Sequence, residues 1–385
     1  MKQKTLALLA VASLLAPGSL RADPPAGLRP ALERASQRPP APPSGVSIAI
    51  AEEDGAGPIF FGINAGEPLT IASVSKTFST AAALSGLGKD YRFRTVLYRT
   101  GTVASGLLSG SLLVVGGGDP NLSGRFYDND IHAVFDRWAD GLRGAGITRI
   151  SGDLLLNAAF FDDQYRNPGW PTGQEARWYQ APVSALSFND NCVSVSVHPG
   201  KSPGAPAAVR FDPPTRFVHA VSSARTVSRG GARVAVARRA GSNVITVAGT
   251  VPFTFGGWST VIAIDDPPQY FGTVLKERLA DDGITVDGDV RLTTQKPDAS
   301  WATVATTTSD LLPSIAVANK RSQSFYAEQI FKTLAAEKGS TGSWSEAVRL
   351  EKEFLASLGL DPSRYDLHDG SGLNPQNRVA ALDIV

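Results

Sequence analysis

Ser73 and Lys76 are the two side chains in this sequence best placed to do covalent chemistry. They stand three residues apart at the start of the apolar run 77–84, so a helix would place both on one face, one turn apart. A serine hydroxyl becomes a nucleophile when a base takes its proton, and a desolvated lysine amine can be that base. Free backbone N–H groups and the positive dipole end at a helix start favour a developing oxyanion. The spacing therefore predicts a serine acyl enzyme.

The elements around this pair have to position it. Two strand-like runs, residues 45–50 and 58–62, precede the pair and supply a sheet on which the helix can pack. The alternative is that Ser73 only caps a surface helix. That alternative does not explain Lys76, whose position should face the sheet and the cleft.

Composition and charge disfavour several other classes of protein. The chain has 385 residues, enough for two or three domains at ~100–200 residues each, and a formal net charge of +1. Charges of both signs are mixed, so we expect no nucleic-acid partner. The histidines are scattered without the paired spacing of metal ligands: His132, His198, His219 and His368. We expect no metal and no cofactor, and the glycine run 116–118 lacks the Gly-Lys-Ser/Thr of a nucleotide site.

The N-terminus predicts export. Lys2 and Lys4 precede an apolar stretch at 6–15, which is shorter than the ~20 residues that span a bilayer. Small and turn residues follow, and cleavage after Ala22 would remove a signal peptide at 1–22. No later segment is long and apolar enough to cross a membrane, so we expect a periplasmic or secreted protein. Cys192 is alone, so it has no partner for an intramolecular disulfide.

The middle of the chain carries a weak internal repeat. A helical pattern at 131–142 leads into Gly-Ile-Thr and a Gly-Asp strand ending at 156, and the same order recurs from 270 to 292. Two similar α/β half-units are one explanation, and coincidence in the turn residues is the other. Residues 185–260 lie between the copies and are rich in β-strand patterns. Helical patterns follow at 311–317, 324–338 and 344–358, with a further helix start expected at Asn374-Pro375.

An ordered set of motifs resembles a known family. The motifs run in the order Ala72-Ser-Val-Ser-Lys76, Gly118-Asp-Pro120, Ala181-Pro-Val-Ser-Ala-Leu186, the segment opening at Ser322, and Asp369-Gly-Ser-Gly-Leu373. Together they resemble class C low-molecular-mass penicillin-binding proteins, exported serine D-alanyl-D-alanine carboxypeptidases and endopeptidases that trim peptidoglycan. The resemblance covers roughly residues 26–385.

The resemblance implies an α/β (α+β) fold with a transpeptidase-like domain split by a large insertion. We expect the signal peptide at 1–22, the first part of that domain at 23–90, the inserted α/β and β-rich region at 91–297, and the second part at 298–385. A small β subdomain is expected near 185–260. Peptidoglycan stem peptides are the implied substrate, and β-lactams are the implied acylating inhibitors.

The same resemblance implies roles for individual residues. Ser73 resembles the acylated nucleophile, Lys76 its proton acceptor, and Ser322 the serine that relays a proton to the leaving amine. In the segment 169–179, family members often carry an acid that meets the amino group of the stem peptide. Glu175 could serve there, or it could be a solvated surface residue.

The chain departs from the family pattern at two places. Ser324 stands where the family's Ser-x-Asn motif has asparagine, and a hydroxyl is too short to bridge substrate and Lys76 as an amide does. The family's Lys-Thr-Gly strand should follow residue 372, but the sequence ends first, and we expect a chain lacking its C-terminal part. Arg99-Thr100-Gly101 resembles the motif but falls at the start of the insertion.

Two other functions remain open at this point. A catalytically impaired or inactive homologue that only binds peptidoglycan is favoured by Ser324 and by the absent Lys-Thr-Gly. Retention of both Ser73 and Lys76 argues against it. A serine β-lactamase shares the Ser-x-x-Lys spacing, but usually has one compact domain, whereas here a long segment separates the first two motifs.

Overall fold

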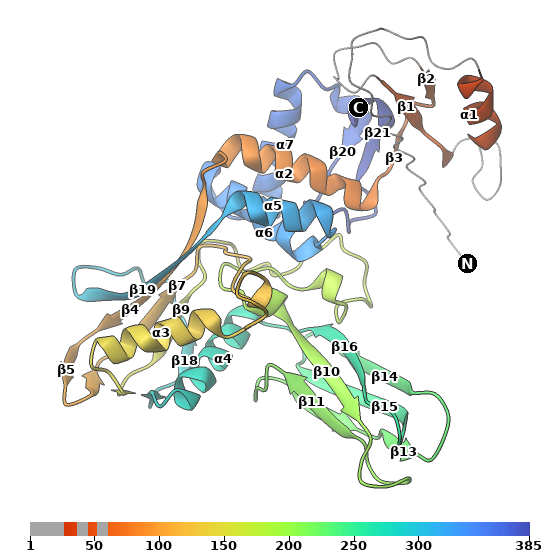
Figure 1. Cartoon of the computed structure of the whole chain (residues 1–385). Helices are drawn as coiled ribbons and strands as arrows, with labels where there is room; N and C mark the ends of the chain where they lie inside the picture. Colours follow the sequence, from red (N-terminus) through yellow and green to blue (C-terminus); the bar gives the residue numbers. More distant parts are fainter. Residues whose placement is uncertain (1–26, 37–44, 52–60) are drawn as a thin grey trace.

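The computed structural model describes residues 27–36, 45–51 and 61–385, so the predicted signal peptide lies outside the described part. Figure 1 shows a helical region, a sheet covered by two helices, and a β-rich extension. A short helix, α1 (Leu28–Ser36), lies apart from them near the N-terminus. Across the described residues, no helix has both the length and the apolar character needed to cross a membrane.

The helical region joins one helix from the first part of the chain to three from the last. α2 (Ser75–Leu87) packs with α5 (Leu311–Lys320), α6 (Ser324–Lys338) and α7 (Trp344–Ser357). Small residues let the helices approach, because a Cβ on Gly86 of α2 would lie 2.6 Å from the Leu334 side chain of α6. The three C-terminal helices form at the predicted positions.

A long antiparallel strand pair connects this region to the inserted one. β4 (Arg92–Thr100) leaves the helical region and β19 (Trp301–Asp310) returns to it, paired along their lengths. Leu311, the first residue of α5, donates its N–H to the carbonyl of Tyr91 at 3.1 Å. The chain therefore enters and leaves the insertion at one point (Figure 1).

The predicted repeat has a structural counterpart. α3 (Ala133–Gly144) is followed by β8 (Arg149–Ile150) and β9 (Leu154–Asn157). α4 (Pro267–Asp281) is followed by β17 (Thr285–Val286) and β18 (Val290–Leu292). β17 pairs in parallel with β8, and β18 with β9, so equivalent strands of the two copies are neighbours.

Both copies build the same layer. The five-stranded sheet has the order β18-β9-β7-β4-β19, with β7 at Leu112–Val115, and α3 and α4 lie on it (Figure 1). A smaller sheet has the order β17-β8-β6-β5, with β6 at Leu107–Ser109 and β5 at Thr102–Ala104. Phe135, Trp138 and Phe271 pack between helices and sheet and are almost completely buried.

The β-rich extension matches the strand patterns predicted for 185–260. β10 (Cys192–His198) pairs with β11 (Ala208–Asp212) and β16 (Trp258–Ala263). The second sheet consists of these strands: β12 (His219–Ser222), β13 (Arg225–Val227), β14 (Arg233–Arg238) and β15 (Val244–Pro252).

Two small sheets lie beside the helical region. β1 (Ile48–Ile50) pairs with β2 (Phe61–Ile63), and the described residues add no third strand. β21 (Arg378–Ala380) lies between β20 (Tyr365–Asp366) and β3 (Pro68–Thr70). The predicted helix start at Asn374 is wrong. The Asn374 side chain accepts from the N–H of Gln376 at 2.9 Å, which makes a tight turn into β21.

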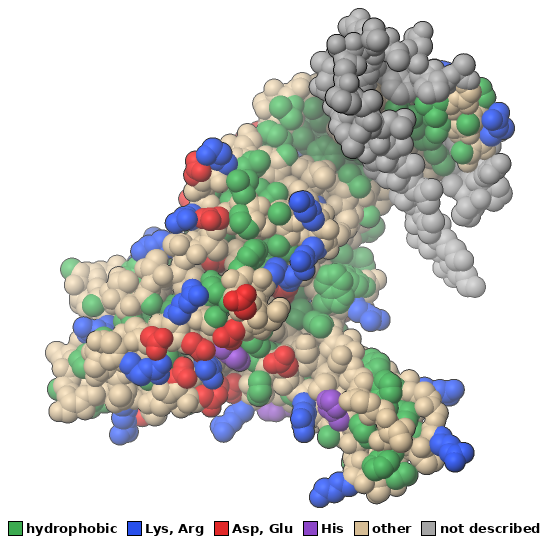
Figure 2. All heavy atoms as spheres, viewed as in Figure 1, with side chains coloured by type: hydrophobic (Ala, Val, Ile, Leu, Met, Phe, Trp, Pro, Cys, Tyr) green, Lys and Arg blue, Asp and Glu red, His purple; other side chains and the backbone are tan. Residues whose placement is uncertain are grey.

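The surface agrees with the mixed charge pattern of the sequence. On the face shown in Figure 2, acidic and basic side chains are interspersed, most densely around α3 and α4. Ion pairs there include Arg278 with Asp136 at 2.6 Å and Arg143 with Asp140 at 2.6 Å.

Candidate active site

The structure brings Ser73 and Lys76 together at the start of α2. Ser73 lies in the short 3₁₀ turn Ala72–Val74 and is exposed, whereas Lys76 lies in the first turn of α2 and is 1% exposed. The two side chains are hydrogen-bonded, with Lys76 Nζ 3.1 Å from Ser73 Oγ. An exposed hydroxyl and a buried amine thus share one contact, as the three-residue spacing predicted.

Burial sets the protonation behaviour of the lysine. Removing the ammonium from water lowers the pKa of Lys76, while the nearby carboxylates of Glu328 and Asp369 act in the opposite direction. Lys76 Nζ also donates to the backbone carbonyl of Ser371 at 2.7 Å. This second contact fixes the nitrogen so that it faces the serine hydroxyl. The arrangement can accept a proton from Ser73 in the way that nucleophilic catalysis by serine requires.

The loop 369–372 forms the floor of the site. Asp369 is fully buried and accepts four hydrogen bonds, from the Trp170 indole and from Gly372, Asn374 and Asn377 at 2.6–2.9 Å. Its carboxylate therefore shapes the turn that carries the Ser371 carbonyl.

Backbone geometry places this loop directly against the nucleophile. Ala72 has a φ of 45° and Gly372 a φ of 80°, both in the left-handed region. A Cβ on Gly372 would overlap the carbonyl group of Ala72 and lie 3.1 Å from the Ser73 nitrogen. Only glycine fits at position 372, because the two backbones touch there.

Ser322 and Ser324 lie at the junction of α5 and α6. Ser322 is exposed with a φ of 52°, and Ser324 is the first residue of α6 and 5% exposed. Asn319 of α5 donates to the Thr80 hydroxyl of α2 at 3.0 Å, so this connection lies beside α2. Within the described part of the chain, no hydrogen bond joins either serine to Ser73 or Lys76. The structure thus brings their segment to α2 without joining it to the nucleophile.

Glu175 lies in a different network. Its side chain accepts from the N–H of Gly173 at 2.9 Å, and its backbone carbonyl accepts from Arg238 of β14 at 2.8 Å. The backbone hydrogen bonds, with Arg166 and Arg238 nearby, lower the pKa of the Glu175 carboxyl. No described contact links Glu175 to Ser73 or Lys76.

Sequence reasoning gave no role to Glu328, although it lies under the site. Glu328 is fully buried in the middle of α6 and accepts hydrogen bonds from Gly370, Ser371 and Trp344. The available signal was a single acidic residue inside the apolar helical pattern 325–334. Arg99 and Thr100 end β4, at the opposite end of the strand from the α5 junction, and this supports excluding Arg99-Thr100-Gly101 from the site.

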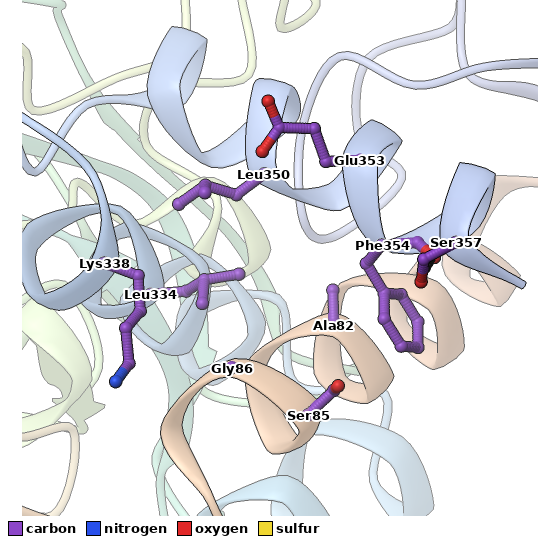
Figure 3. A pocket seen from close by; sticks show the side chains of 9 residues that line it. All are labelled: Ala82, Ser85, Gly86, Leu334, Lys338, Leu350, Glu353, Phe354 and Ser357. Atoms are coloured by element: carbon purple, nitrogen blue, oxygen red, sulfur yellow. Dashed lines mark hydrogen bonds between the residues drawn. The ribbon is translucent and has the colours of Figure 1, made fainter.

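Two hollows lie near these elements. One, of about 280 Å³, is lined by α2, α6 and α7 and is shown in Figure 3, where Leu334, Leu350 and Phe354 give it an apolar wall. Neither Ser73 nor Lys76 lines it. The other, of about 320 Å³, lies beside Gln323 and is lined by the Arg125–Asp190 ion pair and by Trp178.

Comparison with solved structures defines the class of fold. The crystal structure of penicillin binding protein 4 (dacB) from Haemophilus influenzae matches with a TM-score of 0.73 at 23% sequence identity. The match covers 88% of this chain and 73% of that chain. This chain therefore has a penicillin-binding fold with an inserted domain, as the motif order implied.

Sequence comparisons establish the family. The model of the D-Ala-D-Ala carboxypeptidase 3 (S13) family matches residues 28–385, and the chain belongs to that family. It is 30% identical over 355 residues to a D-alanyl-D-alanine carboxypeptidase of Actinomadura sp. (strain R39), covering 90% of this chain and 64% of that protein. It is 25% identical over 351 residues to the D-alanyl-D-alanine carboxypeptidase DacB of Haemophilus influenzae, covering 88% and 69%. The chain thus spans about two-thirds of the length of these relatives.

Proposed function

We propose that this chain is an exported serine D-Ala-D-Ala carboxypeptidase or endopeptidase that acts on peptidoglycan stem peptides through an acyl-enzyme. The observation that supports this most is the contact of 3.1 Å between Lys76 Nζ and Ser73 Oγ. Burial lowers the pKa of Lys76, which increases the fraction of neutral amine available to take a proton. Membership of the S13 family supports the substrate class.

The reaction follows from these two groups. Ser73 Oγ attacks the carbonyl carbon between the two D-alanines, and its proton passes to the neutral amine of Lys76. The tetrahedral intermediate then breaks its C–N bond, the leaving amine takes up a proton, and an ester forms on Ser73. Water attacks that ester and releases the shortened peptide. The positive dipole end at the start of α2 favours the developing oxyanion.

The remaining residues have proposed roles that rest on the family motifs. Ser322 relays the proton to the leaving amine, and its exposure on the connection between α5 and α6 supports that role. Ser324 and Glu175 contact substrate, Ser324 in place of the family's asparagine and Glu175 toward the amino group of the stem peptide. β-Lactams mimic the dipeptide and acylate Ser73 by the same steps.

The domain division and the location are part of the same proposal. We assign a signal peptide to 1–22, the transpeptidase-like domain to 23–90 and 298–385, and the insertion to 91–297. The chain passes between these parts through β4 and β19, which supports boundaries close to residues 90 and 298. Export to the periplasm or cell exterior fits a peptidoglycan substrate.

A second candidate is a catalytically impaired or inactive homologue that binds peptidoglycan without turning it over. Ser324 favours it, since its short side chain is buried at the start of α6 and forms no hydrogen bond with another described residue. An asparagine there would supply an amide that donates and accepts. The loss of one transition-state donor typically lowers the rate by ~10²–10³-fold.

Labelling by a fluorescent penicillin tests the proposal and separates the candidates. The wild-type chain should become covalently labelled, Ser73→Ala should not, and Ser85→Ala should label normally. Ser85 is the matched control because it is an exposed serine on the same helix, α2. A folded wild-type chain that stays unlabelled would favour the inactive binder. Rapid nitrocefin turnover would instead indicate a β-lactamase.

A further inference from the structure

Both carboxylate oxygens of Glu328 accept hydrogen bonds from the backbone of the loop 369–372. Glu328 Oε1 accepts from the N–H of Ser371 at 2.8 Å, and Oε2 accepts from the N–H of Gly370 at 3.2 Å. Oε2 also accepts from the indole N–H of Trp344 at 2.7 Å. A carboxylate with 0% exposure has no water to replace these donors, so its hydrogen bonds fix the backbone that supplies them.

The other side of the same loop is bonded to α2. Ser371 O accepts from Lys76 Nζ at 2.7 Å, and Gly370 O accepts from Ser79 Oγ at 2.7 Å. The N–H groups of Gly370 and Ser371 thus face Glu328 of α6, while their carbonyl groups face α2. Two residues of backbone connect a buried carboxylate to the amine beside the nucleophile.

We propose that Glu328 is a positioning residue, which holds the 370–371 backbone so that the Ser371 carbonyl aims Lys76 at Ser73. This rests on the proposed function, because it gives a cause for the geometry of the Ser73–Lys76 pair. Glu328 touches neither Ser73 nor a reacting atom in this scheme. Its effect on the reaction passes through the position of the Lys76 amine, and a misplacement of about 1 Å can cost ~10²-fold in rate.

Glu351 provides a matched control for a purely structural explanation. It lies on α7, is 0% exposed, and neither of its carboxylate oxygens has a hydrogen-bond partner. Glu328 and Glu351 are thus two equally buried carboxyl groups, and only Glu328 is bonded to the loop. If burial of a carboxyl group were all that mattered, the same substitution at either position would have similar effects.

The charges around Glu328 determine the expected pH dependence. Four titratable groups face Glu328, from α2, from α6 itself, from α7 and from the loop: Lys76, Lys332, Glu351 and Asp369. The Glu328 carboxylate raises the pKa of Lys76, against the dominant effect of burial. Burial raises the pKa of Glu328 to about 7, so the group is negatively charged above that pH. Removing the charge there lowers the pKa of Lys76 further, and the neutral amine appears at lower pH.

The experiment compares Glu328→Gln, Glu328→Asp and Glu351→Gln with wild type. The rate of acylation by a fluorescent penicillin is measured from pH 5 to 10, with hydrogen exchange of the 367–374 segment and thermal melting of each variant. Glu328→Gln should lower the maximal acylation rate by roughly 10–100-fold and shift its rising limb to lower pH. It should also speed exchange at 370–371. Glu328→Asp keeps the charge but shortens the reach, so the rate should fall without that shift.

The control variant should behave differently. Glu351→Gln should acylate within about twofold of wild type across the pH range, because neither of its carboxylate oxygens is hydrogen-bonded to the 370–371 loop. If both Glu328 variants had the acylation rate, the pH profile and the hydrogen exchange of wild type, the inference about Glu328 would be overturned. The proposed function would still stand. If the wild-type chain were not labelled, the proposed function would be overturned. In that case, unchanged hydrogen exchange at 370–371 in the Glu328 variants would separately refute the role of Glu328. If Glu328→Gln does not fold, Glu328→Asp alone decides.

Discussion

Replacing Gly372 by alanine should disturb the nucleophile through its backbone. The φ of 80° at Gly372 is one that L side chains adopt at a cost of about 1–2 kcal/mol. The new Cβ would also overlap the carbonyl group of Ala72, which is backbone and cannot rotate away. Such overpacking costs a further ~1–3 kcal/mol. We therefore expect the free energy of unfolding to fall by roughly 2–5 kcal/mol, with Ser73 displaced.

Gly359 supplies the control for this prediction. Its φ is 81°, almost the same as that of Gly372, but a Cβ there would meet nothing within 4 Å. Gly359→Ala should therefore lose only the backbone contribution of about 1–2 kcal/mol. Urea unfolding gives both free energies, and fluorescent-penicillin labelling gives the consequence at Ser73. Equal destabilisation of the two variants, with normal labelling of Gly372→Ala, would refute the proposed contact between the loop and Ala72.

Three further predictions concern buried groups. Lys76→Met should abolish acylation and lower the melting temperature, because it leaves the buried Ser371 carbonyl without its donor; labelling at the wild-type rate would contradict the role of Lys76 as base. Burial raises the pKa of Glu351 well above its usual value, so the folded state holds a proton that the unfolded state releases above about pH 4.5. The free energy of unfolding of the wild-type chain should then fall with rising pH, by up to ~1.4 kcal/mol per pH unit from this group. Glu351→Gln should remove that slope when unfolding is measured from pH 5 to 8, and an unchanged slope would contradict the raised pKa of Glu351. Burial also raises the pKa of the Cys192 thiol, so a thiol reagent at pH 8 should modify it only after unfolding, and rapid modification of the folded chain would show the site to be open.

Local sequence patterns predicted the structural features that depend on residues close together along the chain. Three-residue spacing placed Lys76 beside Ser73 because a helical turn brings such residues together. Periodicity located α5, α6 and α7, and the repeated Gly-Ile-Thr order pointed to the paired strands around β8 and β17. The order of motifs implied the penicillin-binding fold.

The features that escaped prediction depend on contacts between distant parts of the chain. The Lys76–Ser371 hydrogen bond joins residues 295 positions apart, and no local pattern specifies that pairing. In the sequence, Glu328 is only an acidic residue within an apolar helical pattern. Its hydrogen bonds to Gly370 and Ser371 form because the 369–372 loop packs on α6. Asn374-Pro375 has the composition of a helix start, but the Asn374 side chain makes a turn within its own segment instead.

We propose that a buried amine one helical turn away activates the Ser73 hydroxyl for acyl transfer. Intact-mass spectrometry of the folded chain after exposure to benzylpenicillin, followed by peptide mapping, tests it most directly. We expect the added mass of one benzylpenicillin on the peptide that contains Ser73, and no added mass in Lys76→Met. An unmodified wild-type mass, or an adduct on another residue, would contradict it.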